Sequence, residues 1–424
     1  MSSRFTESVA SAEPGFDFVA AHFQCERNLF SEENPDGYVN FGSAQNFLHP
    51  DQVANLLAKS FYDVSDAHYQ SFSGTEDCRT AIASFLITLA NNRTIQAEET
   101  INVDPAHIVV GNGIISVLEA LAIALLDAGD HILVPTPVFP GLVNALSVRV
   151  DSGVHLLHTA PENDFRLTAV ALEQELASYA KEKRIRAILL SSPGNPVGQV
   201  FSAAELAEFL AVAKKFGCAL IVDEVYAGSC FEHSEFSSAV RLDDEAVYVL
   251  GGLSKDFGLA GFATGWLHGT NTKVMKAVAR QSHFYRLPAP IQRMVQQTLD
   301  PEFAESYLAT HRTSLTQRYK QTKAALHTAG VRISEAEAGL CIWMDLRDRL
   351  EKLDSSSELA VYEYLLNEHR VHVSPSSGFL TPYRGFYRTC FSHQEANLLE
   401  GLKRLRKGLA QRIATEPCLS KVTN

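Results

Sequence analysis

Hydrophobic and polar positions alternate along most of the chain with two periods, one typical of strands and one of helices. From Ile108 to about Gln281, short apolar runs are separated by amphipathic stretches such as Ala203–Phe216. Helical periodicity also marks Cys78–Leu89 and a long segment at about Ala304–Ala329. Because strands that alternate with helices form βαβ units, this pattern predicts a mostly parallel sheet.

The same pattern predicts an α/β fold with two unequal domains. We assign the mostly parallel sheet, with helices on both faces, to a large domain at residues 41–295. A smaller α+β domain follows at residues 296–424 and ends with a helix at Glu395–Leu409. A polar arm, residues 1–40, precedes both domains. A chain of 424 residues is long enough to bury cores of this size.

Composition and charge exclude several classes of protein. Hydrophobic residues make up 46% of the chain and charged residues 20%, which is typical of a soluble globular protein. The net charge of −12 argues against a nucleic-acid partner, which would require a basic face. The apolar run Ala120–Leu126 stops at Asp127, so we expect no membrane span. Because Met1–Thr6 lacks the apolar core of a secretory signal, we expect a cytoplasmic protein.

Cysteines and histidines give no sign of a disulfide framework or a metal site. The seven cysteines include no Cys-x-x-Cys pair, and we expect them to be reduced. Cys218, Cys341 and Cys390 lie within apolar runs, and we interpret them as small core residues. The 15 histidines show no metal-ligand spacing, so the sequence predicts no bound metal.

Three apolar runs of strand length are each followed by a polar residue of chemical interest. These residues are Asn195, Asp223 and Lys255. Because ligands of α/β folds bind at the carboxyl ends of parallel strands, we expect the three side chains to gather there. Burial lowers the pKa of a lysine towards the neutral amine, which is the form that attacks an aldehyde. A lysine for an aldehyde and a carboxylate for a ring nitrogen are what pyridoxal 5′-phosphate (PLP) requires.

The motifs that contain these residues resemble a known family. Asn-Pro-x-Gly at 195–198, Asp-Glu-x-Tyr at 223–226 and Ser-Lys-Asp-x-Gly-Leu at 254–259 are similar to those of fold-type I, class I/II aminotransferases. Within that family, the chain is most similar to the branch that contains the 1-aminocyclopropane-1-carboxylate (ACC) synthases. The resemblance covers most of the chain, and further matching segments are Asn34–Gly37, Gly74–Arg79, Pro135–Gly141, Ala338–Trp343 and Gly385–Phe391.

The resemblance implies that PLP is the cofactor and assigns residues to its ring. Lys255 would bind PLP as a Schiff base and then remove the proton from the substrate α-carbon. Asp223 would pair with the ring nitrogen, and Asn195 and Tyr226 would donate hydrogen bonds to the phenolate oxygen. Phe139 would lie against the ring, although core packing alone would also account for a phenylalanine there.

The phosphate site that the resemblance implies departs from the family pattern. A glycine-rich turn before a predicted helix and Ser254 would hold the phosphate, although a turn into a helix needs glycine in any case. Ala263 stands where relatives have an arginine, and Gly252 where they favour a serine. Thr264 and Arg286 are further candidates for the phosphate. The turn consists of Gly111, Asn112 and Gly113.

The resemblance also assigns residues to the substrate. Arg388 would bind the α-carboxylate through two parallel hydrogen bonds, and Ala44 would line the same site. Tyr69 would reach the phosphate of a neighbouring subunit, a position for which Phe72 is the alternative, and this crossing contact predicts a homodimer. Gln45 replaces an acidic residue of plant ACC synthases, which disfavours a cationic sulfonium substrate.

We therefore predict a PLP-dependent aminotransferase that acts at the α-carbon of an amino acid or related amine. A carbon–sulfur lyase and an ACC synthase-like lyase are the alternatives, because all three reactions use the same residues. A non-catalytic protein that keeps the fold is a further alternative, and the loss of the phosphate arginine at Ala263 is its main support.

Overall fold

The large sheet has seven strands. One inner strand is antiparallel to the other six. This computed structural model describes residues 16–58, 63–91, 101–147, 150, 152–179 and 184–412. Strand β8 pairs antiparallel with both of its neighbours, whereas the other pairings in the sheet are parallel. The strands, in spatial order, are β2 (Ile108–Asn112), β8 (Thr264–Gly269), β7 (Val247–Gly251), β6 (Ala219–Asp223), β5 (Ile185–Ser191), β3 (His131–Thr136) and β4 (Gly153–His158).

Alternate residues of these strands face two separate cores. In β6, for example, Leu220 and Val222 belong to one hydrophobic cluster, and Ile221 between them belongs to another. Three helices cover the face that holds Ile221, namely α5 (Gly113–Leu125), α6 (Pro140–Ser147) and α9 (Thr272–Gln281). Four helices cover the opposite face: α4 (Glu76–Ala90), α7 (Ala169–Tyr179), α8 (Ala203–Lys215) and α10 (Ala289–Thr298). The predicted α/β fold with helices on both faces is confirmed.

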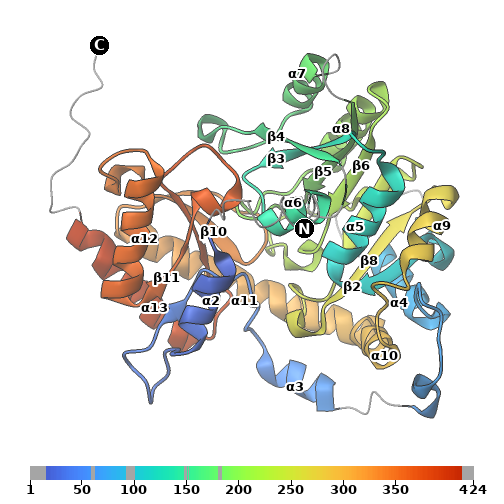
Figure 1. The fold of residues 1–424 in the computed structure, drawn as a ribbon. Coiled ribbons are helices and arrows are strands. Elements are labelled where there is room, and N and C mark those ends of the chain that lie inside the picture. Colours follow the sequence, from blue (N-terminus) through green and yellow to red (C-terminus); the bar gives the residue numbers. More distant parts are fainter. Residues whose placement is uncertain are drawn as a thin grey trace, which may run out of the picture.

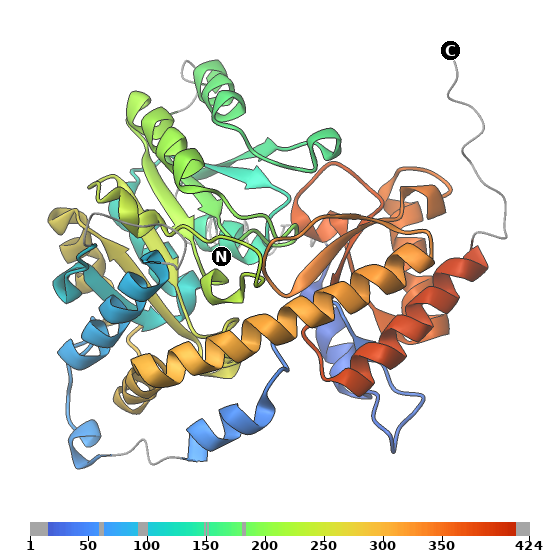
Figure 2. The same cartoon turned by 180° about the vertical axis from the view of Figure 1, so that it is seen from behind.

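A smaller α+β part lies beside the large sheet (Figure 1). Its antiparallel sheet has the order β12 (Ser374–Pro375), β13 (Phe386–Cys390), β10 (Cys341–Asp345) and β9 (Arg332–Ser334). Helices α12 (Ser355–His369) and α13 (Glu395–Arg412) pack in its hydrophobic core. The long helix α11 (Pro301–Thr328) runs from the large part to the smaller one, which Figure 2 shows from behind.

The N-terminal segment packs with the smaller part. Helix α2 (Phe18–Glu26) begins after Asp17, whose side chain accepts hydrogen bonds from the amides of the first turn. Strand β1 (Val39–Asn40) pairs with β11 (Val371–His372), and α3 (Pro50–Ala58) follows. Val39 and Phe41 share a hydrophobic core with the C-terminal helices. The predicted domain boundaries at residues 40 and 295 stay predictions. The segment before residue 40 contacts the smaller, C-terminal part.

Candidate active site

Neighbouring parallel strands bring three polar side chains to one edge of the large sheet. β6 lies between β5 and β7, and their register sets Asp223 beside Ser191 on one side and beside Leu250 on the other. Asp223 is the last residue of β6, while Asn195 and Lys255 follow shortly after the ends of β5 and β7. The structure therefore places these three residues together, at the sheet edge where α/β folds bind ligands.

The side chain of Lys255 is partly buried and is held by the N-terminal segment. Its Nζ donates a hydrogen bond to the carbonyl oxygen of Ala44 at 2.6 Å. Burial lowers the pKa of Lys255, and the nearby Arg388 guanidinium lowers it further. Nδ2 of Asn46 donates to the carbonyl oxygens of Lys255 and Asp256, each at 3.1 Å, and so fixes the backbone. The amine is thus fixed in place and biased towards its nucleophilic form.

Asp223 has a buried carboxyl group, and its contacts with the protein only partly offset the free-energy cost of burying the charge. The residue is 5% exposed, and its Oδ1 accepts a hydrogen bond from the Val225 amide at 3.1 Å. Burial raises the pKa of Asp223 to about 7, although the Val225 amide and the Lys255 ammonium oppose the shift. A buried carboxylate is stabilised when a cationic N–H group binds it. Asp223 is therefore suited to a protonated ring nitrogen.

The hydroxyl of Tyr226 is buried beside this carboxyl group. Within the described part of the chain it has no hydrogen-bond partner. Burial raises the pKa of Tyr226 well above its ordinary value, so the hydroxyl is a neutral donor. Leaving a buried polar group unpaired costs about 1–3 kcal/mol. A ligand oxygen that accepts this proton would recover that free energy, so Tyr226 is a preformed donor.

Arg388 reaches the same place from β13 of the smaller sheet. Its Nη1 donates to Oδ1 of Asn195 at 3.0 Å, and its Nη2 donates to the carbonyl oxygen of Gly42. The rings of Phe379 and Phe18 lie 4.9 and 5.8 Å from the guanidinium carbon. These contacts fix the guanidinium plane, while Nε is buried without a partner in the described residues. A carboxylate can bind such a fixed guanidinium through two hydrogen bonds.

A glycine turn joins β2 to α5 next to β8. Gly113 has a φ of +83°, a backbone conformation that favours glycine. Asn112, the residue before α5, makes no side-chain hydrogen bond to the first turn, so a cap does not occupy those amides. A Cβ atom on Gly265 would lie 2.3 Å from the backbone of Gly113, so β8 must carry a glycine there. Free amides at a helix start suit an anion such as a phosphate.

The structure accounts for one of the two departures at the phosphate site. A Cβ atom on Gly252 would lie 2.5 Å from the carbonyl oxygen of Thr264, so a serine does not fit on this backbone. Ala263 is in the left-handed region, with a φ of +46°. Its carbonyl oxygen lies 3.7 Å from where a Cβ atom of Gly113 would stand, so residue 263 borders the glycine turn. Ser254 is partly buried in the loop before Lys255.

Phe139 lies next to Phe18, which contacts Arg388, whereas Tyr69 lines a different pocket. Phe139 is 37% exposed, and its ring centroid lies 6.4 Å from that of Phe18, which also packs on Arg388. Tyr69 is 87% exposed and lines a different pocket together with Arg286, whose guanidinium carbon lies 5.9 Å from the Tyr69 ring centroid. The structure therefore does not bring Tyr69 or Arg286 to the site of their own chain.

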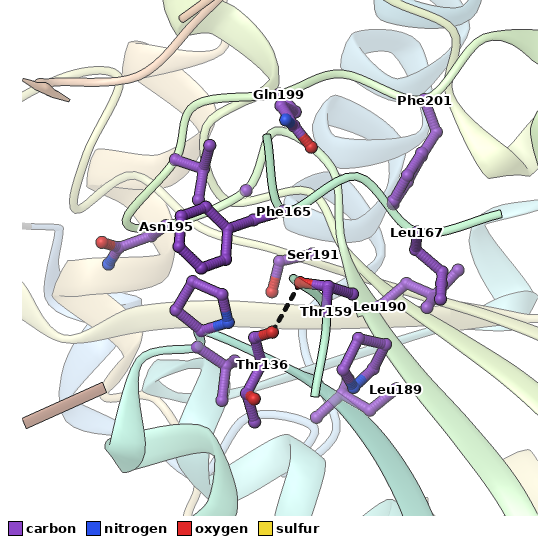
Figure 3. A pocket seen from close by; sticks show the side chains of 15 residues that line it. Thr136, Thr159, Phe165, Leu167, Leu189, Leu190, Ser191, Asn195, Gln199 and Phe201 are labelled. Carbon is purple, nitrogen blue, oxygen red and sulfur yellow. Dashed lines mark hydrogen bonds between the residues drawn. The ribbon is translucent and has the colours of Figure 1, made fainter. Parts of the chain in front are cut away.

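A small cavity opens beside Asn195, at the carboxyl ends of β3 and β5 (Figure 3). Its volume is about 60 Å³, and Oγ1 of Thr159 donates to the carbonyl oxygen of Thr136 in its wall at 2.7 Å. The Asn195 amide group points away from these two threonines (Figure 3). Because the cavity has room for only a few water molecules, we assign no substrate to it.

Two further observations concern only the described residues. No group of three or more histidine, cysteine, aspartate or glutamate side chains there is arranged to hold a metal ion. Among the helices of those same residues, none combines the length and the apolar character needed to cross a bilayer. The absence of a metal site stays a prediction.

The sequence as a whole matches a protein family. Residues 37–405 match the family described as aminotransferase class I and II. This chain belongs to that family. It is 31% identical to 1-aminocyclopropane-1-carboxylate synthase 7 of Arabidopsis thaliana, over 91% of this chain and 90% of that protein. It is 29% identical to the 1-aminocyclopropane-1-carboxylate synthase of Glycine max, over 94% of this chain and 86% of that protein.

Solved structures of aminotransferases share the fold of this family member. The aspartate aminotransferase from Thermus thermophilus with maleate has a TM-score of 0.78 and 22% identity, over 96% of this chain and 99% of that chain. An aminotransferase from Mycobacterium tuberculosis has a TM-score of 0.80 and 22% identity, over 97% and 99%. At these identities the likeness establishes the fold, while family membership establishes a PLP-dependent enzyme.

Some contacts of the site had no signal in the sequence. Asn46 is not among the predicted site residues, although its side chain fixes the backbone at Lys255. Phe18 contacts Arg388 from the predicted polar arm, and Gly42 contacts it from the first residues of the predicted large domain. The burial of the Asn46 side chain identifies it in the structure, but burial of a single polar residue cannot be read from the sequence.

Proposed function

We propose that this protein is an aminotransferase that acts at the α-carbon of an amino acid and binds PLP through Lys255. The observation that supports this most is the convergence of Lys255, Asp223, Asn195 and Arg388 at one sheet edge, with Arg388 hydrogen-bonded to Asn195. These four residues supply an amine, a carboxylate, an amide and a guanidinium. They are the groups that a PLP enzyme needs for an amino-acid substrate.

The polar groups of the site fit those of PLP. Asp223 has a buried carboxyl group for the ring nitrogen, and Tyr226 has an unpaired hydroxyl group for the phenolate oxygen. The side-chain nitrogen of Asn195 is the second donor that we assign to that oxygen, because its Oδ1 is bound to Arg388. The amides at Gly113 would bind the phosphate. Because three of these groups are left unpaired or poorly paired by the protein alone, the site is preformed for a ligand.

The proposed chemistry divides between cofactor and protein. When bound, PLP supplies an aldehyde carbon and a ring that accepts electrons from the substrate α-carbon. Lys255 takes a proton from that carbon and returns one, and its lowered pKa suits a group that must act as base and as acid. Arg388 binds the α-carboxylate and so orients the Cα–H bond towards Lys255. The rings of Phe18 and Phe379 exclude water from the guanidinium.

A lyase that cleaves a carbon–sulfur bond, as an ACC synthase-like enzyme would, is the second proposal. Its support is the similarity to proteins named ACC synthases over about nine-tenths of the chain. Gln45 argues against this second proposal, because its side chain carries no negative charge to bind a cationic sulfonium group. Gln45 lies at the site, since it follows Ala44, whose carbonyl oxygen accepts the hydrogen bond from Lys255. The same residues would bind cofactor and carboxylate in both reactions, so product analysis must separate the two proposals.

We further propose a cytoplasmic homodimer. Tyr69 and Phe284 expose large rings, at 87% and 85%, and burying such groups against a second copy would be favourable. Light scattering of the purified protein tests this, and a monomer at all concentrations would contradict it. We expect the substitution Tyr69→Glu to weaken the dimer, because a charge would be buried in the interface. Imaging of a fluorescent fusion tests the location.

The function is tested on the purified protein after incubation with PLP. We expect a visible absorbance band, and we expect borohydride to fix the cofactor covalently at Lys255, which peptide mass spectrometry locates. A panel of amino acids, including one with a sulfonium leaving group on its γ-carbon, is then assayed with 2-oxoglutarate as acceptor for keto acid, ammonia, thiol and ACC. Keto acid with a stoichiometric amino product supports transamination, whereas ammonia with thiol, or ACC, supports the second proposal.

The matched variants are Lys255→Ala and Lys276→Ala. The second removes an exposed lysine on α9. We expect the first to lower turnover to below about a thousandth, because general acid–base catalysis alone contributes about 10²–10⁴-fold, and the second to leave it unchanged. Turnover that survives in Lys255→Ala, or cofactor fixed at another lysine, would overturn the assignment of Lys255.

A further inference from the structure

Two cysteines face each other across neighbouring strands of the smaller sheet. Cys341 is the first residue of β10 and Cys390 the last of β13, and they are directly opposite in the antiparallel register. Their Sγ atoms lie 2.7 Å apart, and both residues are buried. The two thiols are separated by 49 positions in the chain, so their pairing has no signal in the sequence.

The backbone around them has the geometry of a cross-strand pair. The amide of Phe391 donates to the carbonyl oxygen of Leu340 at 2.9 Å, while the amide of Cys390 donates to Phe41 at 2.8 Å. Cys341 and Cys390 thus occupy the position between two ladder hydrogen bonds, where opposite Cα atoms lie about 4.5 Å apart. A disulfide accommodates Cα separations of about 4.4–6.8 Å. The strands therefore need little movement to allow a bond between the two Sγ atoms.

The charges around Cys341 distinguish it from the other described cysteines, including Cys390, whose pKa burial raises well above its ordinary value. Burial raises the pKa of each of Cys25, Cys78, Cys218 and Cys230. Burial acts on Cys341 as well, but the hydrogen bond from Cys390 and the cations Arg388 and Lys255 outweigh it and lower the pKa of Cys341. Thiolates are the reactive form of cysteine, so Cys341 is the nucleophile of the pair.

We propose that Cys341 and Cys390 are a modification site, at which a small-molecule disulfide oxidises both thiols to one intramolecular disulfide. The Cys341 thiolate attacks one sulfur of the small disulfide, which forms a mixed disulfide and releases one small thiol. The Cys390 sulfur then attacks Sγ of Cys341 and expels the second small thiol. Two protein thiols are oxidised, one small disulfide is reduced, and the two protons end on the two released thiols.

Cys390 lies on the same strand as Arg388, the residue to which we assign the substrate carboxylate. Arg388 and Cys390 are two residues apart on β13, so their side chains project from the same face of the strand. We infer that the pair reacts with a small disulfide that enters the site in the absence of an amino-acid substrate.

The proposal is tested by equilibrating the purified, PLP-loaded full chain in mixtures of reduced and oxidised glutathione, without denaturant. After an acid quench, free thiols are alkylated in denaturant and peptides are mapped by mass spectrometry. We expect one cross-linked peptide pair, Cys341 with Cys390, at oxidising ratios, and its disappearance at reducing ratios. Cys25, Cys78, Cys218 and Cys230 serve as internal controls, which we expect to stay alkylated throughout.

The matched variants are Cys341→Ser and Cys390→Ser. We expect Cys390→Ser to accumulate the mixed disulfide at Cys341, because no second thiol resolves it, and Cys341→Ser to react much more slowly. Two free thiols in the wild type at the most oxidising ratio, or a cross-link that forms only once circular dichroism reports unfolding, would overturn the proposal. The wild-type peptide map decides the question if either variant does not fold.

Discussion

Oδ1 of Asn195 accepts a hydrogen bond from Nη1 of Arg388 across 3.0 Å, although 193 positions separate the two residues in the chain. Asn195 follows a strand of the large sheet, and Arg388 belongs to the smaller one. The bond joins the two parts of the molecule at the proposed site. Because it uses the amide oxygen, it also orients the Asn195 side chain, whose nitrogen remains free to donate to a ligand.

The first prediction concerns the substitution Arg388→Lys. An ammonium cannot form two parallel hydrogen bonds to a carboxylate, and it lacks the planar fork through which the guanidinium contacts Asn195 and Gly42. Hydrogen bonds to charged groups contribute about 1.5–3 kcal/mol, so we expect KM for α-amino acids to rise about 10–100-fold. Steady-state kinetics with an amino acid and with the corresponding amine, which lacks the carboxylate, measure the effect.

The control for that prediction is Arg406→Lys, an exposed arginine on α13. We expect it to change neither KM. If Arg388→Lys raised KM equally for the amino acid and the amine, Arg388 would not be the carboxylate ligand.

Much of the fold was predictable because the signals are local. Apolar runs bounded by polar residues mark β5, β6 and β7, and parallel pairing then brings the residues that follow them to one edge. The long helix predicted at about Ala304–Ala329 is present as Pro301–Thr328. Asn195, Asp223 and Lys255 were predicted to lie together for this reason alone, without knowledge of any distance.

The remaining contacts depend on packing between distant segments. Neither Phe18 nor Gly42 lies near Arg388 in the sequence, and only the docking of the N-terminal segment on the smaller part brings them there. The pairing of Cys341 with Cys390 depends on the register of β10 and β13, which a shift of one residue would abolish. The interpretation of Cys341 and Cys390 as core residues accounts for their burial but not for their pairing.

The second prediction concerns Tyr226→Phe. Because the Tyr226 hydroxyl has no partner in the described residues, its removal should not lower the melting temperature of the PLP-free protein. With PLP present, the variant should lose a donor to the phenolate oxygen and bind the cofactor about 2–10-fold more weakly, as expected for a hydrogen bond worth about 0.5–1.5 kcal/mol. Thermal unfolding with and without PLP and a spectrophotometric titration measure both effects. A lower melting temperature without PLP would show that the hydroxyl has a structural partner.

The third prediction concerns the pH dependence of stability without PLP. The pKa of Asp223 is raised from 3.8 to about 7 in the folded state, so between these values the folded protein keeps a proton that the unfolded chain has lost. The contribution of Asp223 is therefore complete below pH 3.8 and falls as the pH rises towards 7, by about 1.4 kcal/mol per pH unit. Denaturant unfolding of the wild type and of Asp223→Asn across this range measures the contribution, and the variant should show a smaller fall.

PLP should weaken this pH dependence, because a protonated ring nitrogen stabilises the ionised carboxylate of Asp223. The free energy of unfolding in saturating PLP should thus fall less between pH 3.8 and 7 than it does without PLP. Equal pH profiles for the wild type and Asp223→Asn, with and without PLP, would contradict the pairing of Asp223 with the ring.

The last prediction concerns Ala263, which stands where relatives carry a phosphate-binding arginine. Residue 263 borders the glycine turn at Gly113, so a long cationic side chain there could reach a phosphate bound to the amides of that turn. The φ of +46° costs an arginine about what it costs the alanine, because both have a Cβ atom. Arg286 does not replace the missing charge in its own chain, since it is exposed and covers the Tyr69 ring.

We therefore expect Ala263→Arg to tighten PLP binding about 10–100-fold, as expected for a charge-assisted hydrogen bond of about 1.5–3 kcal/mol. Ala263→Gln is the control, because it adds a shorter polar side chain without the charge and should leave the affinity within a few-fold of the wild type. Retention of PLP during dialysis and titration of the PLP-free proteins give the two affinities. If Ala263→Arg bound PLP no more tightly than Ala263→Gln, while Arg286→Ala weakened binding in the wild type, the charge would come from Arg286 of a second subunit instead.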